Sequence, residues 1–152
     1  DSSTSRGLGD VYKRQHQLLM PQGVALKIQL PVLPAIIQAD LHRLTQVITN
    51  LINNAAKFTT QGYILIKYDY TQDKRWIQIS VTDTGKGIPA DKQAQVFERF
   101  NKLDEFAQGT GLGLAICQII IEHFGGYITL ESKEGEGSTF IVTLPYTPGL
   151  SV

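Results

Sequence analysis

Apolar residues recur at helical spacing between Asp40 and Thr59, in the most regular pattern of the chain. Side chains three, four and seven positions apart share one face of a helix, and Asp is a common residue type immediately before a helix. The spacing therefore predicts an amphipathic helix that begins near Leu41 and is closed by Gln61-Gly62. Its apolar arc comprises Leu44, Val47, Ile48, Leu51, Ile52, Ala55 and Phe58.

A narrow polar stripe with Arg43, Asn50, Asn54 and Lys57 runs beside this arc. Asn is a poor helix former and costs about half a kcal/mol relative to Ala at each position. In one interpretation these residues form a solvated face. In the other, Asn50 and Asn54 present amide oxygens to a hard cation such as Mg²⁺, and Lys57 lies near phosphate. The pattern alone leaves both interpretations open.

Alternating apolar and polar positions predict the strands, and Gly, Pro and polar clusters separate them. Asp91 to Arg99 is expected to form a short helix that presents Phe97 and Phe100, and Asn101 to Gln108 a polar loop. By the alternation, Phe140, Val142 and Leu144 point inward. The expected strands cover residues 24–30, 35–39, 63–70, 76–83, 127–132 and 138–145.

A second apolar helix should follow Gly113 and run to about Phe124, where Gly125-Gly126 ends it. Its apolar side chains lie on both sides, so we expect it to be largely buried, with Cys117 as a small core residue. The glycine-rich segment before it has two interpretations. Its free N–H groups suit a phosphate chain, or its glycines only permit close packing. On the helix, Leu112, Ile116 and Ile119 fall on one side, and Gln118 and Glu122 form a narrow polar stripe that faces solvent.

Asp83 ends the strand in which Ile77, Ile79 and Val81 share one face, and by that alternation it continues the apolar face. A carboxylate that points toward a core is costly unless hydrogen bonds compensate it. Asp also commonly opens a turn before Gly, so the segment Asp83–Pro89 is either a turn or a ligand site. Gly85 and Gly87 would allow the backbone to approach a flat ligand or to adopt positive φ.

The bulk properties are those of a single small domain. The 152 residues include 14 basic and 14 acidic ones, and this balance argues against nucleic acid as a partner. One cysteine excludes a disulfide framework. No apolar run approaches the roughly 20 residues that span a bilayer, so we expect a cytoplasmic chain without direct membrane contact. We assign residues 1–15 to an N-terminal extension, 16–147 to the domain and 148–152 to a tail.

Four motifs in order resemble the ATP-binding catalytic domain of sensor histidine kinases, in the superfamily that includes gyrase-type and chaperone ATPases. They are NLINNAAKF at 50–58, DTGKGIP at 83–89, VFERF at 96–100 and GTGLGL at 109–114, and GSTF at 137–140 matches as well. The resemblance implies an α+β fold, a two-layer α/β sandwich. Its sheet would be mixed and mainly antiparallel, with helices on one face, as in the Bergerat-type ATP-binding fold.

The resemblance also implies a site for ATP and Mg²⁺. Asn54 would bind the metal, Asn50 would support the phosphates or metal, and Lys57 and Arg99 would lie near phosphate. Asp83 would accept a hydrogen bond from the exocyclic amine of adenine. The remaining residues implied to contact the nucleotide are Phe58, Gly85, Gly87, Ile88, Phe100, Gly109, Thr110, Gly111, Leu112, Gly113 and Thr139.

The type of reaction depends on Asn50. Hydrolysing relatives typically have Glu at this position, and an amide cannot act as a general base, so transfer of the γ-phosphoryl group to a protein side chain is favoured. His16, His42 and His123 are not followed by an acidic residue. We therefore expect the acceptor His on a dimerisation domain outside this chain, with a response-regulator receiver domain downstream. The alternatives are a stand-alone ATPase or serine kinase of the same superfamily, and a nucleotide-binding module without turnover.

Overall fold

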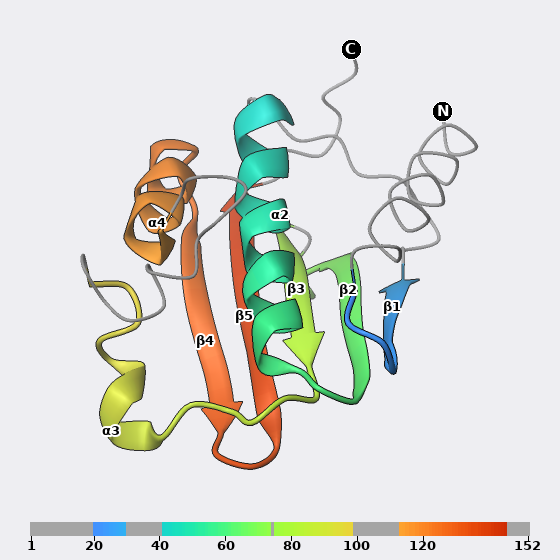
Figure 1. The fold of residues 1–152 in the computed structure, drawn as a ribbon. Helices are drawn as coiled ribbons and strands as arrows, with labels where there is room; N and C mark the ends of the chain where they lie inside the picture. The colour runs from blue at the N-terminus through green and yellow to red at the C-terminus, as the bar shows by residue number, and fades with distance from the viewer. Residues whose placement is uncertain (1–19, 30–40, 74, 99–112, 146–152) are drawn as a thin grey trace.

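The computed structural model describes residues 20–29, 41–73, 75–98 and 113–145 (Figure 1). Five strands form one sheet in the order β1-β2-β3-β5-β4, and the helices α2 and α4 cover one of its faces. This two-layer arrangement is the predicted α+β architecture. The elements in chain order are β1 (Val24–Gln29), α2 (Leu41–Phe58), β2 (Gly62–Tyr70), β3 (Trp76–Asp83), α3 (Ala90–Gln93), α4 (Leu114–His123), β4 (Tyr127–Lys133) and β5 (Gly137–Pro145).

The sheet is mixed, because β1 pairs with β2 in parallel and the other three pairs are antiparallel. Register partners in an antiparallel pair point to the same face. Val81 pairs with both Ile66 and Phe140, and all three are buried. Two residues further along β3, at the end of the strand, Asp83 points to the same face and pairs with Ile64 and Ser138. The helix-covered face is thus apolar along most of its length and polar at the end of β3.

Helix α2 supplies the largest share of the core beneath the sheet. Val47, Leu51 and Ile52 are fully buried, as the helical periodicity predicts. The helix ends at Phe58, before the predicted stop at Gln61-Gly62. Its apolar arc lies over β3, so the residues on the edges of that arc are brought close to the sheet.

The predicted helix from Asp91 to Arg99 is shorter in the structure. Only Ala90–Gln93 is helical, and the chain continues in turns toward Phe97. The N–H groups of Gln95 and Val96 donate to carbonyls three residues earlier, a 3₁₀-type pattern that rarely extends far. Val96 nevertheless reaches the core, and Phe97 packs edge-on against Phe140 with ring centroids 6.1 Å apart.

The expectation that the second apolar helix is largely buried is only partly right. In α4, Cys117 and Ile121 are fully buried, whereas Ile116 and Ile119 are 36% and 49% exposed. The helix packs against α2 and β4 with one side. Apolar residues around most of its circumference could not indicate which side would be covered. Gly125, at φ +84°, ends the helix as predicted.

Several predictions fall outside the described residues. They are the strand at 35–39, the polar loop at 101–108, and the assignments of residues 1–15 and 148–152.

Candidate functional site

Asn54 lies in the last part of α2 with 2% of its surface exposed. Neither its amide nitrogen nor its amide oxygen has a hydrogen-bond partner among the described residues. A buried polar group left without a partner costs about 1–3 kcal/mol. The solvated-face interpretation is therefore wrong for this residue, and its amide is a group that a ligand could satisfy.

The amide oxygen of Asn54 is a suitable ligand for Mg²⁺. Mg²⁺ prefers oxygen ligands and keeps several waters, and it is commonly held by one or two protein groups together with substrate phosphates. The oxygen of Asn54 can serve as such a ligand. No cluster of three or more His, Cys, Asp or Glu side chains that could hold a metal alone occurs among the described residues. A metal bound by Asn54 could complete its coordination with the phosphates of a ligand.

Asn50 lies one turn earlier on the same side of α2 and is also fully buried. Its amide nitrogen donates a hydrogen bond to the sulfur of Cys117 on α4, with a nitrogen–sulfur distance of 3.4 Å. This residue therefore connects the two helices that cover the sheet. The solvated-face interpretation is wrong here too.

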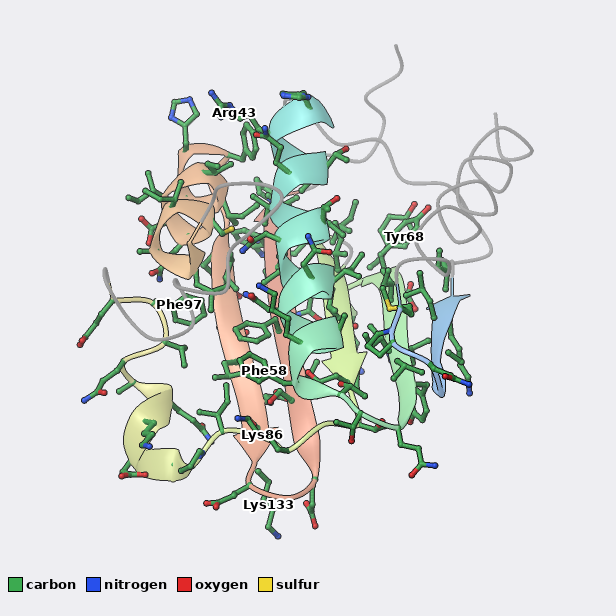
Figure 2. The ribbon with its side chains drawn as sticks, viewed as in Figure 1. Arg43, Phe58, Tyr68, Lys86, Phe97 and Lys133 are labelled. Atoms are coloured by element: carbon green, nitrogen blue, oxygen red, sulfur yellow. The ribbon has the colours of Figure 1, made fainter. Side chains whose placement is uncertain are left out.

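The two cations of the polar stripe are exposed, in contrast to its asparagines. Arg43 lies near the start of α2, where its guanidinium donates to Gln46 at 3.4 Å (Figure 2). Lys57 lies in the last turn. Its position near the end of the helix that carries Asn54 is compatible with a phosphate contact, which stays a prediction.

Asp83 is buried, with 6% of its surface exposed, as the alternation of β3 predicts. Its Oδ1 accepts a hydrogen bond of 2.9 Å from the N–H of Gly85. Burial raises the pKa of this carboxyl above its ordinary value of 3.8, and the N–H groups of Gly85 and Ser138 partly oppose that rise. The carboxylate is thus held in place at the end of the strand, in a low-dielectric position where a hydrogen-bond donor on a ligand would bind strongly.

The glycines after Asp83 are required by the protein's own backbone. A side chain on Gly85 would overlap the carbonyl of Phe58, and one on Gly87 would overlap the carbonyl of Lys133. The N–H of Lys86 also points to the carbonyl of Phe58, at 3.4 Å. This loop is therefore packed against the end of α2, and a contact of its glycines with a ligand stays a prediction.

Three residues that the sequence did not single out hold this loop. Ser132 Oγ accepts a hydrogen bond from the N–H of Ile88 at 2.8 Å and lies 2.7 Å from the hydroxyl of Ser138. The amide of Gln93 donates to the carbonyls of Ile88 and Ser132 at 2.8 and 2.9 Å. Extending the inward alternation of β5 by one step from Phe140 would have identified Ser138. Nothing in the sequence pattern pointed to Gln93.

The ring of Phe58, at the end of α2, faces the ammonium group of Lys86 (Figure 2). The nitrogen is 4.8 Å from the ring centroid, a cation–π distance. Phe58 is half-buried and Lys86 is exposed. One face of this aromatic ring is therefore covered by a flexible side chain, which a planar ligand could displace.

Thr139 is on the other face of the sheet from Asp83. Its hydroxyl lies 3.0 Å from that of Thr82, its register partner on β3. Because neighbouring residues of a strand point to opposite faces, Ser138, and not Thr139, lies beside Asp83 on the helix-covered face. The structure does not bring Thr139 together with the other predicted residues.

Gly113 immediately precedes α4, in an extended conformation, and its carbonyl accepts the N–H of Cys117. The other predicted residues of this region, Arg99, Phe100, Gly109, Thr110, Gly111 and Leu112, lie outside the described residues.

The contact between Gly85 and Phe58 connects the loop after Asp83 to the end of the helix that carries Asn54. Gly85 packs against the carbonyl of Phe58 and donates its N–H to Asp83. Asn54 lies four residues before Phe58, about 6 Å along the helix axis. A buried carboxylate and a buried unpartnered amide therefore occupy the same end of the molecule, on the helix-covered face of the sheet. Such a pair of groups could bind a ligand that has a hydrogen-bond donor on a ring at one end and a metal-binding group at the other.

The fold and this site define the class of the protein. Residues 39–148 match the family model described as histidine kinase-, DNA gyrase B-, and HSP90-like ATPase. The chain belongs to this family, as a catalytic domain of the histidine kinase type.

Among the curated relatives are a protein named as a histidine kinase and one named as a sensor protein. The chain is 42% identical over 125 residues to the circadian input-output histidine kinase CikA of Synechococcus elongatus, a match that covers 79% of this chain. It is 46% identical over 111 residues, 70% of its length, to the sensor protein SrrB of Staphylococcus aureus. The matches cover only 16% of CikA and 19% of SrrB, so the chain corresponds to a small part of each relative.

Solved structures give the same result for the fold. The chain resembles full-length ShkA, crystallised in complex with AMPPNP, with a TM-score of 0.76 and 30% identity. That match covers 91% of this chain and 30% of ShkA. The nucleotide-free catalytic domain of the histidine kinase ThkA matches with a TM-score of 0.72 and 29% identity, over 94% of this chain and 92% of that domain.

Within the described part of the chain, no helix combines the length and the apolar character that a membrane span requires.

Proposed function

We propose that this chain binds Mg²⁺·ATP and transfers the γ-phosphoryl group to a His on a dimerisation domain of the same parent protein. The observation that carries the proposal is the contact between Phe58 and Gly85. This contact places the unpartnered amide of Asn54 and the buried carboxylate of Asp83 at one end of the helix-covered face. The family supports ATP as the ligand, and the likeness to ShkA in complex with an ATP analogue agrees with it.

At the adenine end, Asp83 is the specificity group. A carboxylate accepts the hydrogen bond of an exocyclic amine, and a ring with a carbonyl at that position could not donate one. The N–H of Gly85 fixes Oδ1, so the carboxylate is oriented before the ligand arrives. Phe58 provides an aromatic surface nearby, and Lys86 must leave that surface for a base to stack there.

At the phosphate end, Asn54 would bind Mg²⁺ through its amide oxygen. When bound, the metal would neutralise charge on the phosphates and orient the terminal one for transfer. Asn54 has no partner to give up for this role within the described residues, so its buried amide would gain a ligand on binding. Lys57, exposed one turn further along, would contribute a mobile positive charge near the phosphate chain.

Asn50 decides between transfer and hydrolysis in this proposal. Its amide is buried, donates to Cys117 and cannot take a proton from water. With no base at this position, the γ-phosphoryl group is kept for a nucleophile that another domain presents. The acceptor would be a His, the next recipient would be a receiver domain of a response regulator, and the reaction would take place in the cytoplasm.

The test has a binding step and a transfer step. Calorimetric titration of the chain with a non-hydrolysable ATP analogue and Mg²⁺ should show one site, lost in Asp83→Asn and weakened in Asn54→Ala. With labelled ATP and a separate His-bearing dimerisation domain, the label should move to that domain. Absence of binding by the wild-type chain would contradict the proposal. Sustained phosphate release without an acceptor would favour a stand-alone ATPase instead.

A further inference from the structure

The sulfur of Cys117 is a hydrogen-bond acceptor for the side chain of Asn50. The nitrogen–sulfur distance is 3.4 Å, and both residues are fully buried. Asn50 belongs to α2 and Cys117 to α4, so the bond joins the two helices that cover the sheet. Of the four buried residues of α4, which are Leu114, Ala115, Cys117 and Ile121, only Cys117 has a side-chain atom that can accept a hydrogen bond.

This bond has a consequence for the amide oxygen of Asn50. The amide is planar, so fixing the direction of its nitrogen also fixes the direction of its oxygen. Without a partner the terminal torsion of Asn is broad and roughly two-fold. The hydrogen bond to the thiol favours one of these two orientations. Asn50 lies one helical turn from Asn54 on the same side of α2.

We propose that Cys117 is a positioning residue of the metal–nucleotide site, which it serves by orienting the amide of Asn50. The inference rests on the proposed function, because it concerns the Mg²⁺–triphosphate end of the same site. Residues that hydrogen-bond to the ligands of a metal, and so orient them, commonly have a measurable effect on metal affinity. Cys117 would act through Asn50 and would contact neither metal nor nucleotide.

The measurement that isolates this role is the gain in nucleotide affinity caused by Mg²⁺. It is the ratio of the dissociation constants of a non-hydrolysable ATP analogue with EDTA and with Mg²⁺. In Cys117→Ala the acceptor is removed, and we expect this ratio to fall roughly three- to tenfold, the range of one hydrogen bond. Cys117→Ser keeps an acceptor and should retain most of the gain.

Two controls separate positioning from loss of packing. Ile121→Val removes a methyl group from a fully buried residue one turn further along α4. It should lower the melting temperature and leave the Mg²⁺ gain unchanged. In an Asn50→Ala background, adding Cys117→Ala should have no further effect on the gain.

A spectroscopic readout needs no nucleotide. The side-chain NH₂ resonances of Asn50 should shift in Cys117→Ala and stay in place in Ile121→Val. An unchanged Mg²⁺ gain in a folded Cys117→Ala variant, or unshifted NH₂ resonances, would overturn this inference and leave the proposed function intact. Absence of nucleotide binding by the wild-type chain would overturn both.

Discussion

The main chain of Gly87 lies directly against the carbonyl group of Lys133, and no side chain fits between them. Gly87 also has a φ of +71°, which favours glycine. Next to this contact, the N–H of Gly135 donates to the carbonyl of Lys86 at 2.7 Å. The loop that follows Asp83 is therefore held by the turn between β4 and β5, near which Lys86 and Lys133 both project (Figure 2).

This contact gives a prediction with a matched control. Gly87→Ala should lower the free energy of unfolding by about 2–5 kcal/mol, because steric overlap adds to the cost of positive φ. Gly135 has φ +85° but open space around it, so Gly135→Ala should cost only about 1–2 kcal/mol. Urea unfolding of the two variants measures the difference. Equal losses would show that conformation alone requires glycine at position 87.

Asn54 gives a prediction in which stability and binding change in opposite directions. Asn54→Leu replaces a buried unpartnered amide with an apolar group of similar shape. The nucleotide-free domain should become more stable by about 1–3 kcal/mol. Mg²⁺-dependent binding of the ATP analogue should be lost.

Asn53→Leu, on the adjacent half-buried position, is the control and should leave nucleotide binding intact. Chemical denaturation and calorimetry on both variants provide the data. If Asn54→Leu destabilised the domain, the amide would have a partner in the nucleotide-free protein.

The periodicity of the sequence correctly predicted the orientation of those elements that have one clearly apolar face. In α2 the apolar arc is narrow, so its orientation against the sheet followed from the sequence, and Val47 and Leu51 are buried as expected. In β3 the alternation was regular enough to place Asp83 on the apolar face. Both cases involve one element whose two sides differ strongly in polarity.

The predictions from the sequence failed where the environment of a residue depends on its contacts with a neighbouring element. Helix α4 is apolar nearly all round, so the exposure of Ile116 and Ile119 depends on where α2 and β4 lie. Thr139 is a different case, because the motif suggested its role whereas the alternation of β5 itself places Ser138, and not Thr139, on the face of Asp83. The reason for Gly85 is also non-local, since the atom that excludes a side chain belongs to Phe58.

The two neighbours on β5 provide a direct test of that correction. Ser138→Ala removes a hydroxyl that lies 2.7 Å from Ser132 on the side of Asp83. We expect it to weaken nucleotide binding roughly three- to tenfold, as the loss of one hydrogen bond would. Thr139→Val removes a hydroxyl that faces Thr82 on the other side of the sheet.

Thr139→Val should therefore leave nucleotide affinity unchanged, with a small effect on stability. The comparison requires only titrations with the ATP analogue at fixed Mg²⁺. A stronger effect from Thr139→Val than from Ser138→Ala would restore the role that the motif suggested for Thr139.

The last prediction concerns pH and rests on the raised pKa of Asp83. Burial is the main cause of that rise, and the N–H groups of Gly85 and Ser138 partly counter it. The folded protein therefore keeps the proton to higher pH than the unfolded chain does. Asp83 contributes most to stability below the unfolded value of 3.8, and this contribution is lost as pH rises through the folded pKa. At neutral pH the buried carboxylate thus lowers the stability of the nucleotide-free domain.

Asp83→Asn should accordingly raise the free energy of unfolding of the nucleotide-free domain near neutral pH, because a neutral amide replaces a buried charge. It should also abolish binding of the ATP analogue. The advantage of the variant over the wild type should shrink as pH falls through the raised pKa of folded Asp83 toward 3.8, since the wild-type carboxyl then becomes neutral as well. Urea unfolding at a series of pH values measures this difference. Asp91→Asn, at an exposed position on α3, is the control and should change the free energy of unfolding little. A destabilised Asp83→Asn domain, or an advantage that grows toward low pH, would mean that hydrogen bonds to the carboxylate outweigh the cost of burying it.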